Sequence, residues 1–144
     1  MRSKLFVPGS RPELFDKALR GDADALSFDL EDSVSEGRKA DARAALQALL
    51  SGPSARASGK ILIARVNARG SVHFDADVRA VVRPGLALLN LPKVESAGDV
   101  LAAVAALEAA ERANGVTEPV GLLLNIEFWN NGDWSVGRMK GLGS

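Results

Sequence analysis

Short apolar runs and amphipathic runs alternate along most of this chain, and that alternation restricts the fold more than any other feature of the sequence. The apolar runs end at proline, glycine or charged residues, which is typical of buried strands. The runs between them repeat apolar residues every three or four positions, which is typical of helices that pack through one face. We expect strands at 4–7, 25–30, 61–66, 86–91 and 120–126, and helices at 11–19, 36–50, 75–82 and 96–113.

The strict order of strand and helix predicts a parallel sheet whose strands are joined by helical crossovers. Such sheets occur in open doubly wound folds and in closed barrels, and periodicity alone does not choose between them. The first strand leads into Pro8-Gly9-Ser10-Arg11, which is neither a Walker loop nor a dinucleotide fingerprint, so a Rossmann cofactor site is not expected. We expect Pro92 to end the fourth strand, and Ser96 to cap the last helix.

The composition excludes several kinds of site. The chain has no cysteine, which rules out disulfides, zinc thiolates and thiol nucleophiles and is compatible with the cytoplasm. Lys plus Arg equals Asp plus Glu at 18 each, so the basic excess of a nucleic-acid binder is missing, and no apolar run has the roughly 18 residues of a membrane helix. The only histidine, His73, is expected on the surface of a loop. Any metal should therefore be held by oxygen, which favours Mg²⁺ or Mn²⁺.

Charged side chains gather at the expected carboxyl ends of the strands, where parallel α/β folds place their reactive groups. They are Asp29, Glu31 and Asp32 after the second strand, Arg65 and then Asn67 after the third, Lys93 and Glu95 after the fourth, and Glu127 after the fifth. Carboxylates suit a divalent cation, and a guanidinium suits a carboxylate or phosphate, so the set predicts a site for a metal and an anionic ligand. Each of these residues taken alone is also compatible with a solvated surface charge.

Four motifs, in order along the chain, resemble the citrate lyase β-subunit family, which includes the HpcH/HpaI aldolases. They are RSKLFVPGSRPE at 2–13, DLEDSV at 29–34 with Lys39 and Ala42-Arg43 beyond it, RVN at 65–67 and LPKVES at 91–96. The resemblance covers roughly residues 2–127. Because relatives adopt a TIM-type (β/α)8 barrel, it implies an α/β fold in which this chain forms part of such a barrel, with about five parallel strands and intervening helices.

The resemblance also implies a function. Such proteins are Mg²⁺-dependent carbon–carbon lyases, which cleave or form an acyl-CoA-linked hydroxy acid such as citryl-, malyl-, methylmalyl- or citramalyl-CoA. The small-molecule partner is then an acyl-CoA or a keto acid, and relatives are commonly homo-oligomers, as trimers or hexamers. The assignments that follow are Arg65 to the keto-acid carboxylate, Phe6, Arg11 and Lys17 to the CoA portion, Glu127 to the metal, and Asp29, Glu31 and Asp32 to the metal's waters and nearby basic groups.

The length of the chain and its last segment depart from the family pattern. A (β/α)8 barrel takes about 250 residues, and this chain has 144. We expect a domain of residues 1–127 and an aberrant, poorly ordered tail at 128–144, which shows neither a helical stripe nor strand alternation. The second metal carboxylate of relatives has no counterpart, so impaired activity is expected. The alternatives are a class II pyruvate aldolase that uses no CoA, and a non-catalytic truncated fragment that pairs its exposed strand edges with a partner chain.

Overall fold

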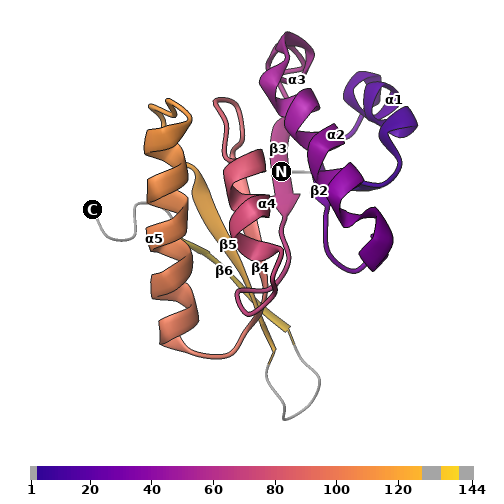
Figure 1. Cartoon of the computed structure of the whole chain (residues 1–144). Coiled ribbons are helices and arrows are strands. Elements are labelled where there is room, and N and C mark those ends of the chain that lie inside the picture. Colours follow the sequence, from indigo (N-terminus) through magenta and orange to yellow (C-terminus); the bar gives the residue numbers. More distant parts are fainter. Residues whose placement is uncertain (1–2, 128–133, 140–144) are drawn as a thin grey trace.

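The computed structural model describes residues 3–127 and 134–139, in which strands and helices alternate (Figure 1). The elements in chain order are β1 (Lys4–Pro8), the short 3-10 helix η1 (Pro12–Leu14), α1 (Phe15–Arg20), β2 (Ala25–Asp29), the short 3-10 helix η2 (Glu36–Arg38), α2 (Lys39–Ser51), α3 (Pro53–Ala57), β3 (Ile61–Arg65), α4 (Phe74–Val81), β4 (Leu88–Val94), α5 (Ala97–Ala113), β5 (Gly121–Glu127) and β6 (Trp134–Met139).

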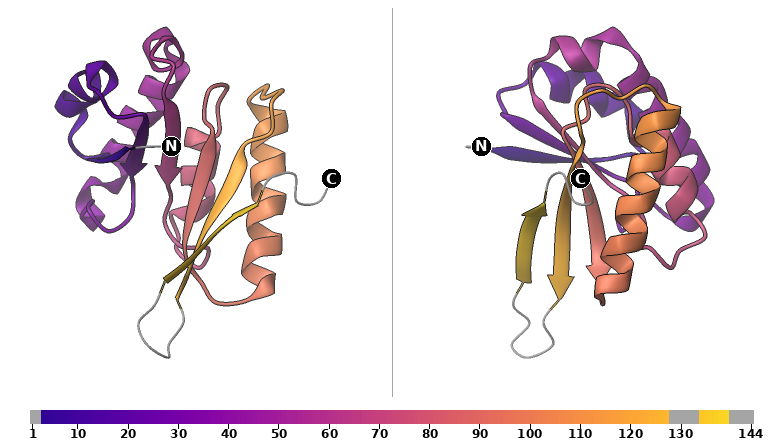
Figure 2. Two further views of the ribbon diagram at one scale, coloured as in Figure 1. Left: turned by 180° about the vertical axis from the view of Figure 1, so that it is seen from behind. Right: turned by 90° about the vertical axis from the view of Figure 1, so that its left-hand side faces the viewer.

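The strands form one sheet in the order β1-β2-β3-β4-β5-β6. β1 to β5 are parallel to their neighbours, and β6 runs antiparallel to β5. The helices lie on one side of the sheet (Figure 2). Sequential strand order with helices on a single side is the arrangement of a (β/α)8 barrel, whereas a doubly wound sheet carries helices on both sides. The expected five parallel strands with intervening helices are therefore confirmed.

Alternate residues of each strand face the helices and build the main core. On β2 and β3 these residues are Leu26, Phe28, Leu62 and Ala64, all at most 1% exposed. Phe28 meets Phe15 of α1 edge to face, with ring centroids 5.2 Å apart. The other side of the sheet carries a much smaller apolar cluster, made of Ala25, Ile63 and Leu88. The helix-facing side thus holds the fold together, and the opposite side is where polar side chains of the strands collect.

β4 differs from the expectation because it continues through Pro92 to Val94. Proline lacks the N–H that a sheet ladder needs, so it was expected to end the strand. β4 pairs with β3 only as far as Asn90, and on the β5 side the register shifts between Leu91 and Val94. Pro92 therefore sits where its missing N–H interrupts no ladder, and the strand bulges there instead of ending.

The last helix begins as predicted. The Ser96 hydroxyl accepts a hydrogen bond from the backbone N–H of Asp99 at 3.2 Å, which caps the first turn of α5. Beyond the other end of α5, Gly115 has φ +69°, a left-handed conformation that glycine adopts without strain.

β6 is a strand that the sequence did not predict, and it lies within the segment that we expected to be a tail. Its six residues pair with β5 from Leu122 to Glu127. The physical reason is the edge of β5, whose unpaired backbone groups accept any extended segment within reach. The expected poor order of residues 128–133 and 140–144 concerns positions outside the described part of the chain, so the boundary at residue 127 stays a prediction.

No helix in the described part of the chain combines the length and the apolar character needed to cross a membrane.

Candidate functional site

The carboxyl ends of β2 and β3 bring an acid and a base side by side. The register pairs Asp29 with Arg65, and Arg65 in turn with Asn90, so the three side chains form one row on the same side of the sheet. Arg65 donates from Nε to Oδ1 of Asp29 at 2.7 Å. Asn90 is 5% exposed, and its buried Oδ1 has no donor among the residues that the structure describes. The row is thus polar although it is largely shielded from solvent.

Protein donors occupy both oxygens of the Asp29 carboxylate. Besides Arg65, Oδ1 accepts the backbone N–H of Glu31 at 2.9 Å, and Oδ2 accepts that of Ser33 at 2.8 Å. Burial disfavours the charged carboxylate, but the hydrogen bonds from Arg65, Ser33 and Glu31 together outweigh it and lower the pKa of Asp29 from 3.8 to about 2. Asp29 is therefore ionised at neutral pH and holds Arg65 in one orientation.

Arg65 is a charged fork of which only one edge is bound. The hydrogen bond to Asp29 raises the pKa of Arg65, and burial acts in the opposite direction without reversing it. Its side chain is 25% exposed, and in the described part of the chain no acceptor binds its two Nη nitrogens. A planar guanidinium with free Nη donors is suited to bind a carboxylate through two parallel hydrogen bonds.

A second ion pair lies beside Arg65. Glu31 is 6% exposed, its Oε2 lies 2.9 Å from Nζ of Lys93, and its Oε1 lies 3.6 Å from Nε of Arg65. Asp32 stands at the rim, with an Oδ1 3.8 Å from Nζ of Lys93. With Asp29, three carboxylates face two cations, and this excess of negative charge suits the binding of a further cation. Lys93 was expected at a strand end but was given no role from the sequence, and Asn90 of the row was not singled out at all.

A polar network on the helix side of the sheet holds the peptide of Glu31. Lys39, the first residue of α2, donates from Nζ to the carbonyls of Leu30 at 3.1 Å and Glu31 at 2.9 Å, and to Oδ1 of Asn67 at 2.8 Å. Asn67 is buried, and its Nδ2 donates to the Leu30 carbonyl and to Oδ2 of Asp77. The backbone ahead of Asp32 is thus fixed from α2, from the end of β3 and from α4.

The same network continues outward from Asp77 to the surface. Arg43 donates from Nε to Oδ1 of Asp77 at 2.9 Å, and its Nη2 lies 3.0 Å from Nδ1 of His73. Because arginine only donates, Nδ1 accepts, and Nε2 of His73 carries the proton that it shares with Glu36 at 2.7 Å. This bond to His73 lowers the pKa of Glu36. His73 lies at the surface as expected, but its side chain is only 19% exposed because Arg43 and Glu36 hold the ring between them.

We expect Lys39→Met to loosen the Glu31 peptide. The variant keeps the aliphatic stem but removes three charge-assisted hydrogen bonds, which should lower the free energy of unfolding by about 1.5 kcal/mol. Amide hydrogen exchange at Glu31 and Ser33 should also quicken about tenfold, because a loss of this size is a factor of ten in a local opening equilibrium. The measurements are urea unfolding and exchange followed by NMR.

Lys60→Met is the matched control for this variant. Lys60 also donates to two backbone carbonyls, of Gly21 and Ala23, but it precedes β3 and so lies at the opposite edge of the sheet. Lys60→Met should lower the free energy of unfolding, but it should not quicken amide hydrogen exchange at Glu31 and Ser33. Equal exchange rates at these two amides in both variants would show that Lys39 does not hold the peptide.

The three residues assigned to the CoA portion are exposed, and none of them bonds to Asp29 or Arg65 in the described part of the chain. Phe6 of β1 is 63% exposed, and its ring lies 4.9 Å from Nζ of Lys4. Arg11 forms an exposed ion pair with Glu13 at 2.6 Å, which lowers the pKa of Glu13. Lys17 is exposed on α1. Their roles stay predictions.

Glu127, the residue assigned to the metal, is the last residue of β5 and therefore stands at the same edge of the sheet as Asp29 and Arg65. Its side chain lies outside the described residues. Within the described ones, no group of three or more His, Asp or Glu side chains is placed to hold a metal ion. The donors around the row nevertheless fit a hard cation, since they are oxygens with an excess of negative charge. The metal role of Glu127 stays a prediction.

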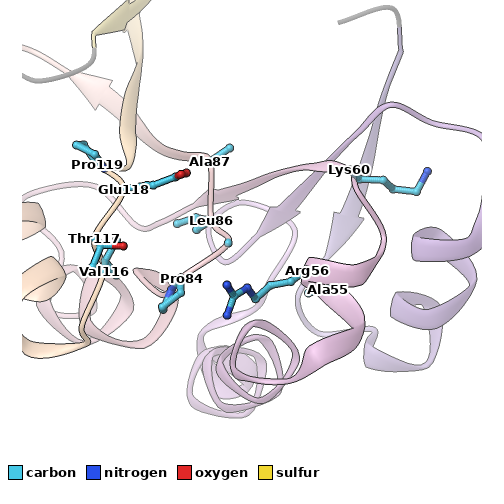
Figure 3. Close-up of a pocket in the computed structure, with 11 residues that line it drawn as sticks. Ala55, Arg56, Lys60, Pro84, Leu86, Ala87, Val116, Thr117, Glu118 and Pro119 are labelled. Atoms are coloured by element: carbon cyan, nitrogen blue, oxygen red, sulfur yellow. The ribbon is translucent and has the colours of Figure 1, made fainter.

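A cavity of about 450 Å³ lies at the opposite edge of the sheet, between segments that precede β3, β4 and β5 (Figure 3). Arg56 and Glu118 border it on two sides, and Leu86 lies between them. In barrel enzymes the reactive groups gather at the carboxyl ends of the strands, and the amino ends serve stability. The candidate site is therefore the row of Asp29, Arg65 and Asn90 with the side chains around it. The cavity lies at the other edge of the sheet and is not part of this site.

The sequence model of the HpcH/HpaI aldolase/citrate lyase family matches residues 2–130, which is nearly the whole chain. The chain belongs to this family. Two members with known activities show how far the similarity reaches. An L-malyl-CoA/β-methylmalyl-CoA lyase of Cereibacter sphaeroides is 38% identical over 129 residues, which are 88% of this chain and 40% of that protein. The β subunit of citrate lyase from Escherichia coli K12 is 41% identical over 128 residues, 88% of this chain and 41% of that subunit.

Solved structures of the family agree with the fold. A citrate lyase from Burkholderia xenovorans superposes with a TM-score of 0.70 at 24% identity, over 86% of this chain and 40% of that one. The CitE protein of Mycobacterium tuberculosis, in complex with magnesium, acetoacetate and coenzyme A, superposes with a TM-score of 0.54 at 36% identity, over 69% of this chain and 35% of that one. The expected family and its barrel-type fold are thus confirmed, and the chain spans about two fifths of the length of the curated relatives it matches.

Proposed function

We propose that this chain forms part of a magnesium-dependent carbon–carbon lyase of the citrate lyase β-subunit and malyl-CoA lyase type. Its substrate is an acyl-CoA-linked hydroxy acid such as citryl-, malyl- or citramalyl-CoA, which it cleaves or forms. The observation that carries the proposal is the state of Arg65. In a chain of this family, Asp29 fixes the guanidinium of Arg65 through Nε, and none of the described residues binds its Nη nitrogens, at the carboxyl edge of a barrel-type sheet.

In this proposal Arg65 binds the carboxylate of the keto acid, and Asp29 keeps the guanidinium charged and oriented. Glu127 holds Mg²⁺, or Mn²⁺ in its place, while Glu31 and Asp32 orient the metal's waters and the basic groups nearby. Bound magnesium supplies a Lewis acid that polarises the keto oxygen and stabilises the negative charge that develops when the carbon–carbon bond breaks. The structure of the relative with magnesium, acetoacetate and coenzyme A supports this set of ligands.

The CoA portion is assigned to Phe6, Arg11 and Lys17. An exposed aromatic ring and two exposed cations suit the adenine and the phosphates of coenzyme A, respectively. Binding of acetyl-CoA separates this function from that of a class II pyruvate aldolase, which would bind only the free acid. We further propose that the protein acts in the cytoplasm, which its lack of cysteine supports. We also propose that it forms a homo-oligomer, because members of the family commonly do.

Arg65→Ala tests the proposal. Removing the guanidinium should raise the dissociation constant for acetoacetate, measured by calorimetry with Mg²⁺ present, at least about tenfold, because a charge-assisted bidentate contact is lost. Arg65→Lys should recover only part of this affinity, since an ammonium cannot form the planar pair of bonds.

Arg20→Ala is the control for the loss of a positive charge, because Arg20 forms an exposed pair with Asp16 on α1. Its affinity for acetoacetate should equal that of the unmodified chain. If Arg65→Ala bound acetoacetate as tightly as the control did, the role of Arg65 and the proposal built on it would be rejected.

A further inference from the structure

Lys93 has a backbone conformation that no other described residue except glycine shares. Its φ is +54°, in the left-handed region, where a side chain costs roughly 1–2 kcal/mol. The register of β4 against β5 shifts at the same place, between Leu91 and Val94. Bulges of this kind re-aim a side chain, and strained residues that persist in a fold tend to serve a site. The strain at Lys93 therefore calls for an explanation in terms of what its side chain reaches.

The side chain of Lys93 reaches Glu31. Nζ of Lys93 lies 2.9 Å from one carboxylate oxygen of Glu31, which is hydrogen-bonding distance. The other oxygen lies 3.6 Å from Nε of Arg65, beyond that distance. Glu31 thus stands between Lys93 and Arg65, and of these two cations only Lys93 is close enough to form a hydrogen bond with it. Because Glu31 is 6% exposed, water offers its carboxylate little alternative.

The charges around Glu31 determine where its carboxylate would go without Lys93. The acids Asp29 and Asp32 repel it, and Lys39 binds its backbone carbonyl but not its side chain. Arg65 would be the one remaining cation close to the carboxylate among the described residues, and its Nη nitrogens are open. A carboxylate bound there would take the donors that a ligand carboxylate needs.

We propose that Lys93 is a positioning residue that holds Glu31 away from Arg65, so that the guanidinium fork stays open to the carboxylate of a keto-acid ligand. The left-handed backbone and the bulge at the end of β4 are what bring its ammonium to Glu31. The inference deepens the proposed function and rests on the assignment of Arg65 to a carboxylate. Its central claim, that Glu31 moves onto Arg65 when Lys93 is absent, concerns the ligand-free chain and is tested there as well.

Acetoacetate binding with Mg²⁺ present gives the first test. Lys93→Ala should weaken binding about tenfold, because the Glu31 carboxylate competes for Arg65. In the Glu31→Gln background, adding Lys93→Ala should change the affinity by less than about threefold, since a neutral amide competes poorly for Arg65. A tenfold loss from Lys93→Ala in that background as well would mean that Lys93 contacts the ligand itself, and the proposal would be overturned. An unchanged affinity in Lys93→Ala would overturn it too.

Lys93→Gly separates charge from strain. It removes the same ammonium as Lys93→Ala but relieves the left-handed backbone, so it should unfold about 3 °C higher than the alanine variant. Its acetoacetate affinity should nevertheless equal that of Lys93→Ala. An affinity that followed the unfolding temperature would indicate a merely structural role and would contradict positioning by charge.

NMR of the Arg65 side chain gives a readout that needs no ligand. Rotation of its guanidinium about the Nε–Cζ bond should slow in Lys93→Ala, when Glu31 binds the Nη nitrogens, and should recover in the double variant. Lys60→Ala, at the other edge of the sheet, should leave the rotation unchanged. Unaltered Arg65 rotation in Lys93→Ala would refute the inference whether or not the chain binds acetoacetate. Slowed rotation together with absent acetoacetate binding would support it and instead reject the proposed function.

Discussion

Asp77→Ala is expected to lower the free energy of unfolding by about 4 kcal/mol, because it breaks a buried ion pair from one side. Asp77 is 1% exposed on α4. One of its oxygens accepts the Nε–H of Arg43 at 2.9 Å, and the other accepts the backbone N–H of Asn67 at 3.0 Å and its Nδ2–H at 2.6 Å. The alanine variant leaves three buried or half-buried donors without an acceptor, one of them charged.

Asp75→Ala is the matched control for that variant. Asp75 and Asp77 both lie in the first turn of α4, so both favour the positive end of the helix dipole, but Asp75 is exposed. Urea unfolding should therefore show a small loss for Asp75→Ala and a loss several times larger for Asp77→Ala. Similar losses in the two variants would mean that the helix dipole, and not the bonds to Arg43 and Asn67, accounts for the effect.

Asp77→Ala should also disturb the candidate site, although Asp77 is not part of that site. Asp77 orients Asn67, and Asn67 with Lys39 fixes the carbonyls of Leu30 and Glu31. Stability and site geometry are thus joined through one set of hydrogen bonds on the helix side of the sheet. The large cost of Asp77→Ala and the loosening expected for Lys39→Met are two consequences of that set.

The sequence was sufficient to bring two of the three residues of the row, Asp29 and Arg65, to one edge of the sheet. Asp29 and Arg65 each end an apolar run, and in a parallel sheet the carboxyl ends of neighbouring strands meet at one edge. That argument predicts proximity, and the structure confirms it with a bond of 2.7 Å. It does not predict the register, which decides that Arg65 faces Asp29 directly and meets Glu31 only at 3.6 Å.

The partners of the helix-side network were beyond sequence reasoning for a physical reason. Arg43 lies on α2, whereas Asp77 lies on α4 and His73 directly precedes α4, so their pairing depends on how α2 packs against α4. Local periodicity reports which face of a helix is apolar, but not which polar residue at its border meets another. For this reason the bonds that hold the ring of His73 between Arg43 and Glu36 could not be predicted.

The contact of Lys93 with Glu31 was not predicted, although Lys93 stood among the charges expected at the strand ends. The rule that proline ends a strand placed it in a loop, where a lysine is ordinarily solvated. In the structure Pro92 lies beyond the last residue pair with β3, so β4 runs on and a bulge directs Lys93 to Glu31. A strand can continue past a proline where the neighbouring strand has already ended. The local sequence around the proline does not show where that neighbour ends.

Acid should destabilise this protein partly through Asp29, and Asp29→Asn should remove that contribution. The pKa of Asp29 is lowered to about 2 in the folded chain against an ordinary 3.8, so between these values the unfolded chain binds the proton more readily. The stability that Asp29 contributes is therefore fully present above about pH 4 and is lost as the pH falls toward 2. A shift of this size corresponds to roughly 2 kcal/mol.

Urea unfolding of both chains between pH 7 and pH 2 measures this contribution. At pH 7 the asparagine variant should be less stable by about 2 kcal/mol, because Arg65 loses its charged partner, and the gap should close between pH 4 and pH 2. Asp16→Asn, which breaks only the exposed pair with Arg20, should run nearly parallel to the unmodified chain throughout. A gap that stayed constant down to pH 2 would mean that Asp29→Asn acts through lost hydrogen bonds alone, and that the charge of Asp29 does not stabilise the fold.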